Sequence, residues 1–314
     1  MSPGRRTLRV ALTAAALLVS GPAQRVGEGQ QAVFRSGLDL VNVGVTVTDR
    51  KGSFITDLRP EDFELLEDGR KQTITYFAGG DSATATPPLH LGLLFDTSGS
   101  MGDDINLSRS AAVRFLNTLN DAEDMTLVDF DTEVRVARYG QQDFPRMVER
   151  IRARRPDGYT ALYDALGVFL DGASDNDGRT ILVLYTDGGD TRSSIAFAEA
   201  LTLVRASDAT IYAVGFLDHQ PSSTRFAQRS QLTELAETTG GQAFFPLTMK
   251  DVDSAYDKVV AQVRAQYSLG YVSTNPKKDG SWRKVTIRLT RPALKDARLQ
   301  SRKGYFALYS KEGH

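Results

Sequence analysis

The sequence contains no cysteine and only three histidines, His90, His219 and His314. The absence of cysteine excludes disulfide bonds, thiolate nucleophiles, cysteine-ligated zinc and a lipid-bearing N-terminal cysteine. Because histidines are so few, catalytic triads and histidine-rich metal sites have almost no residues to draw on. Any metal bound by this chain must therefore be held by oxygen atoms.

The chain also lacks an excess of charge of either sign, since 38 basic residues face 39 acidic ones. No overall field therefore attracts nucleic acid or an anionic membrane, and neither is an expected partner. We interpret the arginines at positions 150, 152, 154 and 155 as an exposed face of the fold. A length of 314 residues with 41% hydrophobic content suggests roughly two domains with a sizeable core.

Residues 1–23 have the composition of a targeting segment. Three arginines precede a short apolar run from Val10 to Val19, which is followed by the small residues Ser20 to Ala23. This order is typical of a secretory signal peptide, and the apolar run is short for a membrane span. We expect cleavage near Ala23, no membrane span afterwards, and a secreted or periplasmic protein. The Arg5-Arg6 pair permits twin-arginine export as well as the general route, and an uncleaved anchor or a disordered tail are the alternatives.

Two stretches with the alternation of β-strands lie on either side of a long central region. Residues 32–78 contain the alternating valines Val41 to Val47, a strand-like piece from Phe54 to Leu58, and a hairpin. Residues 264–310 alternate in the same way. Each stretch is too small to be stable alone, so we expect the two to pair into one antiparallel β-sandwich. Two separate small β units would have the same local pattern.

The central region has a different rhythm. Residues 79–88 are small, polar and end in two prolines, which is the composition of a linker. From residue 89 to 263 strand patterns alternate with helix patterns, and strands such as Ile181 to Leu184 are apolar throughout. This pattern predicts an α/β domain with a doubly wound, mainly parallel sheet covered by helices on both faces. The domain would be inserted into the β-sandwich or flanked by its two halves.

Oxygen-bearing side chains follow the ends of the predicted strands. Asp96, Ser98 and Ser100 come directly after the first strand, and Asp187 follows the most apolar one. Thr160 ends a glycine-containing loop at the start of a predicted helix. Ligands of doubly wound sheets bind beyond the carboxyl ends of the strands, so these five side chains are expected to meet there. Carboxylate and hydroxyl oxygens suit a hard cation such as Mg²⁺.

This set of residues resembles a von Willebrand factor type A domain with a metal-ion-dependent adhesion site. The resemblance covers residues 89–263, and it rests on the Asp-x-Ser-x-Ser motif together with the threonine and the second aspartate. Tyr159 departs from the family pattern, in which glycine is common at that position. The resemblance implies a metal site made of Asp96, Ser98, Ser100, Thr160 and Asp187, with Mg²⁺ as the ion and Mn²⁺ or Ca²⁺ as alternatives.

The resemblance also implies a mode of binding. Because three of the five ligands are neutral hydroxyls, the ion would remain under-neutralised and attract an acidic residue of a partner protein. We therefore expect a protein-binding or adhesion module rather than an enzyme, since no general base, nucleophile or phosphate-binding loop accompanies the motif. One alternative is a metal-dependent hydrolase or phosphoryl-transfer enzyme that uses Asp96, although position 98 lacks a second acid. Another is a structural envelope protein whose metal site is vestigial.

Overall fold

The computed structural model describes residues 40–79, 87–119, 122–174, 176, 178–307 and 309. The predicted signal peptide and most of the predicted linker lie outside these residues. The strands are β1 (Leu40–Thr48), β2 (Phe63–Glu67), β3 (Arg70–Gln72), β4 (Ile74–Ala78), β5 (Leu89–Asp96), β6 (Asp124–Phe130), β7 (Val134–Gly140), β8 (Arg179–Thr186), β9 (Thr210–Gly215), β10 (Ala243–Phe244), β11 (Tyr267–Val272), β12 (Trp282–Leu289), β13 (Arg298–Ser301) and β14 (Gly304–Phe306). The α-helices are α1 (Ile105–Thr118), α2 (Phe144–Ala153), α3 (Leu162–Ala173), α4 (Phe197–Ala206), α5 (Ser222–Thr238) and α6 (Met249–Ala265).

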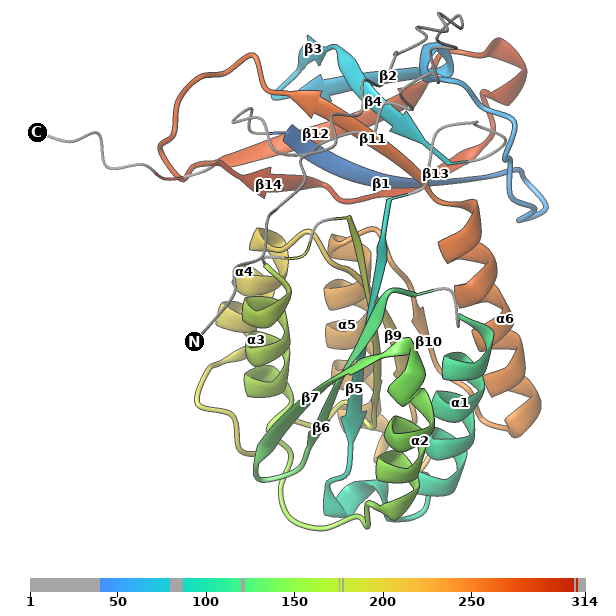
Figure 1. The fold of residues 1–314 in the computed structure, drawn as a ribbon, viewed down its shortest axis with the longest axis vertical. Coiled ribbons are helices and arrows are strands. Elements are labelled where there is room, and N and C mark those ends of the chain that lie inside the picture. The colour runs from blue at the N-terminus through green and yellow to red at the C-terminus, as the bar shows by residue number, and fades with distance from the viewer. Residues whose placement is uncertain are drawn as a thin grey trace, which may run out of the picture. The chain divides into compact units, whose positions relative to one another are not determined.

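The central domain is built on a six-stranded sheet with the order β10-β9-β8-β5-β6-β7. All pairs are parallel except the one between β6 and the edge strand β7. Helices α1, α2 and α6 contribute to the hydrophobic core on one face, and α3, α4 and α5 to the core on the other (Figure 1). The expected doubly wound fold is therefore confirmed.

One glycine sets the distance between β5 and a covering helix. A Cβ atom at Gly92 would lie only 2.2 Å from two ring atoms of Phe169 in α3. A residue without a side chain is thus required for α3 to pack this closely. The neighbouring residues of β5 alternate in the usual way, with Leu93 in the core on the α1 face and Leu94 in the core on the α3 face.

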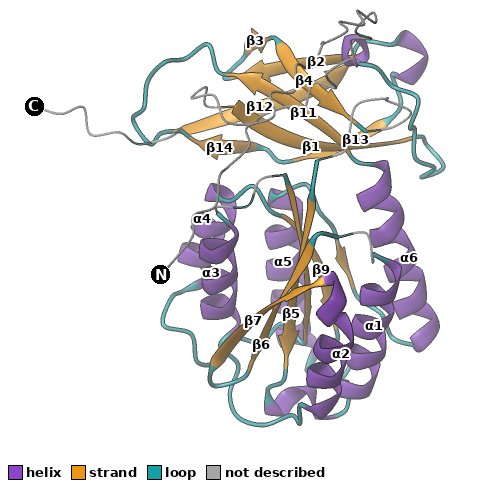
Figure 2. Cartoon of the chain, in the orientation of Figure 1, coloured by secondary structure: helices purple, strands orange, loops and turns teal. Residues whose placement is uncertain are grey.

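The antiparallel strands form two further sheets, with the orders β13-β1-β11-β4 and β14-β12-β2-β3. In both sheets a strand that precedes the central domain pairs with one that follows it: β1 with β11, and β2 with β12. Figure 2 shows strands making up almost all of this part, whereas helices surround the six-stranded sheet. The two sheets share one core, which includes Val45, Leu65 and Leu269. The central domain is thus inserted in sequence between the strands of a β-sandwich.

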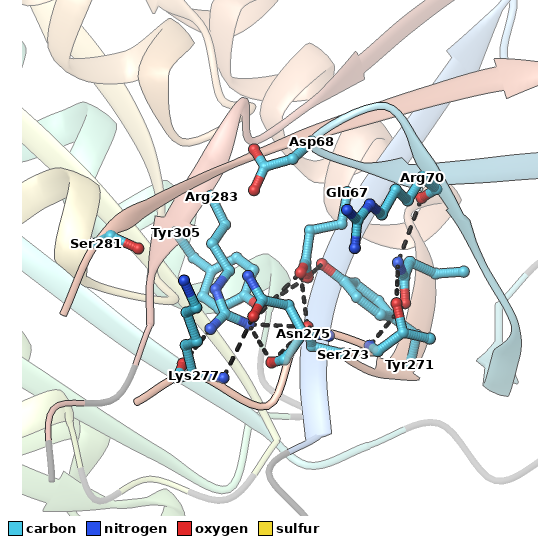
Figure 3. A network of polar contacts seen from close by, with 12 residues as sticks. Glu67, Asp68, Arg70, Tyr271, Ser273, Asn275, Lys277, Ser281, Arg283 and Tyr305 are labelled. Carbon is cyan, nitrogen blue, oxygen red and sulfur yellow. Dashed lines mark hydrogen bonds and ion pairs between the residues drawn. The ribbon is translucent and has the colours of Figure 1, made fainter. Parts of the chain in front are cut away.

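A buried polar network crosses the β-sandwich core (Figure 3). The Glu67 carboxylate, in a residue that is only 2% exposed, accepts hydrogen bonds from the hydroxyls of Tyr271, Ser273 and Tyr305 at 2.9, 2.6 and 2.8 Å. The equally buried Arg283 lies 3.5 Å from the same carboxylate and donates to Ser273 as well. The network therefore joins strands of both sheets to the segment that follows β11.

The predicted strand from Phe54 to Leu58 is wrong. Only Phe54 makes a β-bridge, to Thr48. The Tyr267 hydroxyl instead accepts a hydrogen bond from the Leu58 amide at 3.1 Å and donates one to the Ile55 carbonyl at 2.8 Å. The Ile55 amide still donates to the Val47 carbonyl of β1 at 2.9 Å, but beyond it the Tyr267 side chain, and not a strand partner, satisfies the Ile55 carbonyl and the Leu58 amide.

The helices also differ from the expectation in detail. The sequence pattern did not predict α2. It indicates a helix from about Gln231 to Thr238, whereas α5 already begins at Ser222. The last helix of the central domain, α6, continues to Ala265. None of the helices in the described ranges is both long and apolar enough to cross a membrane.

Candidate metal centre

The candidate centre lies where the connections of the six-stranded sheet change direction. The chain moves from β5 to β6 on one side, while β8 and β9 lie on the other side of β5. Asp96 is the last residue of β5, and Asp187 directly follows β8. Because β5 and β8 are parallel neighbours, both carboxylates stand at the same edge of the sheet, at its switch point.

Asp96 is fully buried and organises the loop that follows it. Its Oδ1 atom accepts a hydrogen bond from the Ser98 amide at 2.9 Å. Its Oδ2 atom accepts one from the Thr186 hydroxyl at 2.6 Å, which connects the ends of β5 and β8. The Ser98 and Ser100 hydroxyl oxygens lie 3.1 Å apart, so this loop brings two of the predicted ligands together.

A second loop is held against the first by its backbone. The Gly99 amide donates to the Gly158 carbonyl at 3.1 Å, and the Asp157 amide donates to the Thr97 carbonyl at 3.0 Å. Gly158 has a φ of +73°, and a Cβ there would lie 2.4 Å from the Thr132 hydroxyl oxygen. Glycine is therefore required at this turn by both its backbone angle and its surroundings.

The remaining two candidate ligands are Thr160, on the same loop as Gly158, and Asp187, on the loop that follows β8. Thr160 is 3% exposed, and its amide donates to the Thr191 hydroxyl at 3.0 Å. Asp187 is 2% exposed and accepts hydrogen bonds from the Gly189 amide at 3.2 Å and the Gln220 side chain at 3.1 Å. The structure thus places all five predicted site residues on three loops at one edge of the sheet.

The two carboxylates of the centre lack a positively charged partner. None of the ion pairs among the described residues includes Asp96 or Asp187. Burial, together with the nearby charge of Asp187, raises the pKa of Asp96 to about 7. The metal-free protein therefore holds two adjacent acidic groups away from water with only hydrogen bonds to stabilise their charge.

A third buried carboxylate in the same sheet shows the contrast. Asp129 in β6 is also fully buried, but Arg135, Arg150 and Arg154 place their Nε atoms 2.9, 2.7 and 2.7 Å from its oxygens. The prediction of a wholly exposed arginine face was thus wrong for Arg150 and Arg154, which turn inward. Basic side chains accompany this buried acid, as is usual in proteins, whereas no ion pair to Asp96 is found in the described part of the chain.

The donor set fits a hard divalent cation. It offers two carboxylates and three hydroxyls, with no sulfur or nitrogen ligand, as Mg²⁺ prefers. Within the described residues, no group of three or more histidine, aspartate or glutamate side chains is positioned to hold a metal. A metal bound at this edge would thus depend on the hydroxyls of Ser98, Ser100 and Thr160 as well as on the two acids.

Further polar and aromatic residues lie next to the loops of the centre. Asp104 directly precedes α1, a position at which an aspartate commonly caps a helix, but its side chain makes no capping hydrogen bond. It lies 3.5 Å from His219 instead, and its burial raises its pKa against the opposing effect of that histidine. The partly exposed Asp190 accepts hydrogen bonds from the Tyr163 amide and the Ser193 hydroxyl. Tyr159 is 65% exposed, so most of this residue faces solvent.

Three supporting residues were missed by the sequence reasoning. Thr186, Gln220 and Thr191 hold Asp96, Asp187 and Thr160 respectively, through the hydrogen bonds given above. Thr186 could have been found, because it is the last residue of an apolar strand and precedes a predicted ligand. Gln220 and Thr191 carry no local pattern that marks them.

Comparison with known proteins agrees with the fold. The model of the von Willebrand factor type A domain matches residues 90–261. No curated protein matches the chain. A solved structure described as von Willebrand factor type A from Catenulispora acidiphila is similar, with 14% identity over 89% of this chain and 76% of that chain and a TM-score of 0.47. So is the vWF domain of the type V pili tip protein Mfa5 from Porphyromonas gingivalis, with 14% identity over 57% of this chain and 96% of that chain and a TM-score of 0.46.

Proposed function

Because this chain belongs to the von Willebrand factor type A domain family, we propose that it is an exported protein that binds a protein partner through a divalent cation. In this proposal Asp96, Ser98, Ser100, Thr160 and Asp187 hold the ion. An acidic residue of the partner then completes its coordination.

One observation carries the proposal: Asp96 and Asp187 are both buried at the ends of neighbouring strands, and among the described residues no basic side chain pairs with them, whereas three pair with Asp129 in the same sheet. A bound Mg²⁺ would supply the missing positive charge and an open position for a further carboxylate. Hydrogen bonds within the chain already hold both carboxylates in position to bind the ion. Thr186 and the Ser98 amide fix the Asp96 carboxylate, and Gln220 fixes that of Asp187.

The oxygen donors fit Mg²⁺, and Mn²⁺ or Ca²⁺ have the same preference for oxygen. We propose Mg²⁺ as the natural ion. Export through the N-terminal segment, to the periplasm or the medium, belongs to the same proposal. It would place the chain where a partner on an envelope surface can be reached.

A catalytic role for Asp96 is a less suitable explanation of the geometry. Both of its oxygens already accept hydrogen bonds, and the residue is fully buried. We therefore expect no Mg²⁺-dependent hydrolysis of phosphate or ester substrates. Turnover by the wild type that Asp96→Ala abolishes would establish the hydrolase alternative instead.

The partner interaction is expected to require both the ion and the Ser98 hydroxyl. Immobilised wild-type chain should retain proteins from the native medium or envelope extract in Mg²⁺ and release them in chelator. Ser98→Ala should retain none of them, because it removes one proposed ligand while leaving the backbone hydrogen bond to Asp96 in place. Ser53→Ala, which removes an exposed hydroxyl from the β-sandwich part, should behave as wild type. Capture that neither chelator nor Ser98→Ala reduces would contradict the proposal.

Stabilisation by Mg²⁺ is expected to depend on pH. Because the folded, metal-free protein raises the pKa of Asp96 to about 7, well above the value of about 4 in an unfolded chain, protonated Asp96 favours folding at low pH. That contribution is lost as the pH rises from about 4 to 7, and a bound cation compensates for the loss. The rise in melting temperature on adding Mg²⁺ should be larger at about pH 8 than at about pH 5. An equal or smaller rise at the higher pH would contradict this account.

A further inference from the structure

A groove with a volume of about 480 Å³ runs along an outer face of α1, beside the end of α2. Its lining includes Arg109, Arg114 and Arg152, together with amide and hydroxyl side chains such as Asn106, Ser110 and Asn117. No carboxylate is among the residues that line it. The groove is therefore polar and positively charged, unlike the acidic centre described above.

Both walls of the groove lead to the loops of the metal centre. Helix α1 begins at Ile105, shortly after Ser100, and α2 ends at Ala153, shortly before Thr160. The two helices lie next to each other (Figure 1), and the Arg109 guanidinium donates a hydrogen bond to the carbonyl of Arg154, across the two chain segments. A ligand that reaches from the centre into the groove would thus follow α1 from its first turn.

The positive charge is uncompensated at the end of the groove nearest to those loops. Arg109 has only neutral partners, the Asn106 side chain at 3.2 Å and the Arg154 carbonyl. Arg152 is exposed and makes no hydrogen bond or ion pair with any other described residue. At the opposite end, by contrast, Arg114 is paired with two aspartates of α6. The positive charges of Arg109 and Arg152 are therefore available to a ligand at the N-terminal end of α1, next to the loops of the metal centre.

We propose that this groove binds further acidic residues of the partner, next to the carboxylate that completes the metal site. The inference rests on the proposed function, and it names the partner chemistry as an extended acidic segment. The lining of α1 from Asn106 to Thr118 spans about 18 Å, which about five residues of extended chain would cover. Arginine suits this role because its guanidinium pairs with carboxylates in a bidentate manner.

The groove favours an acidic protein segment over a nucleic acid. The chain has a formal charge of −1, and Asp253 lies against Arg114 at the far end of the groove. A long polyanion would meet this acidic border, whereas a short segment would end before it. Only three arginines line the groove, and one of them is already paired with aspartates, whereas nucleic acids require a broad basic face.

The test uses fluorescein-labelled hexaglutamate, with hexaglutamine as the uncharged control, and measures anisotropy with the full chain. Wild type should bind hexaglutamate and not hexaglutamine, and the binding should weaken as salt is raised. Arg152→Glu should weaken it about five- to tenfold, because it replaces an unpaired positive charge by a negative one. Arg70→Glu changes the net charge equally on an exposed residue of β3, and it should bind as wild type does.

Several results would overturn the inference: no binding of hexaglutamate, equal binding by Arg152→Glu and wild type, an equal loss in Arg70→Glu, or binding of a heparin fragment in place of the peptide. The titration is made both in Mg²⁺ and in chelator. The effect of Arg152→Glu should remain in chelator, and Mg²⁺ binding by this variant should equal that of wild type. Loss of peptide binding in Arg152→Glu therefore tests the groove alone, whereas a failure of the metal centre is detected by the Ser98→Ala capture experiment and by Mg²⁺ titration of the wild type.

Discussion

Replacing Asp96 by alanine is expected to weaken Mg²⁺ binding by at least a hundredfold. The loss of an outer partner of a metal ligand typically costs about 10- to 100-fold in affinity, and Asp96 is proposed to belong to the ligand set itself. Its carboxylate also holds the Ser98 amide, so the variant disturbs a second ligand. Calorimetric titration of the chelator-treated protein measures the effect. Asp171→Ala, which removes an exposed carboxylate near the end of α3, is the matched control and should bind as wild type does.

A second substitution separates metal binding from folding. Asp96→Asn keeps an oxygen that can accept a hydrogen bond from Thr186 or from the Ser98 amide, but it removes the charge. Its circular dichroism should match that of the wild type, and its Mg²⁺ affinity should fall as in Asp96→Ala. A folded Asp96→Asn protein with wild-type affinity would show that the carboxylate is not a ligand.

Replacing Glu67 by alanine is expected to lower the free energy of unfolding of the β-sandwich by about 3–5 kcal/mol. The substitution leaves Arg283, which is 3% exposed, as a buried charge without its carboxylate. It also removes the acceptor of the buried Tyr271 hydroxyl and of the partly buried Tyr305 hydroxyl. Urea unfolding followed by the fluorescence of Trp282 measures this part of the molecule, because the chain's single tryptophan lies in β12.

Glu64 on the same strand provides the control for Glu67. It faces the other side of β2, where it lies 3.6 Å from Lys71 and 3.9 Å from Arg288 in partly exposed ion pairs. Because exposed pairs contribute little, Glu64→Ala should change the free energy of unfolding by less than about 1 kcal/mol. Similar effects of the two substitutions would mean that the buried network does not hold the sandwich together.

The architecture could be predicted because its main signals are local. The run from Leu91 to Phe95 is apolar without interruption, which indicates a strand buried on both faces, and the structure has it as β5. The alternating valines of β1 indicate a strand with one buried face, and Val43, Val45 and Val47 are indeed fully buried. Periods of two residues and of 3.6 residues need no knowledge of the rest of the chain.

The errors arise where a distant residue decides the structure. Nothing near Ile55 and Leu58 shows that the Tyr267 hydroxyl, from beyond the central domain, will occupy their backbone groups. The first turns of α5 are polar, and Phe226 there is 78% exposed, so no apolar stripe marks where the helix begins. In α2 the apolar residues Met147 and Ile151 do have helical spacing, but they are only two, and four of the ten residues of the helix are charged.

The position of the five candidate ligands at one edge of the sheet could also be predicted. These five residues follow strand ends or a glycine turn, and the topology of a doubly wound sheet then brings them to one edge. The sequence could not show that Asp96 lacks a basic partner. Asp129, in the neighbouring strand, is paired with three arginines, and no local pattern distinguishes the two aspartates in this respect. That contrast appears only in three dimensions, and the proposed function depends on it.

Titration of the chelator-treated wild-type protein with Mg²⁺, at a pH above the pKa of Asp96, tests the central claim most directly. The account predicts saturable binding of a single ion to each chain, and the loss of that binding in Asp96→Ala. Heat no greater than that of dilution, or binding that Asp96→Ala leaves unchanged, would contradict it.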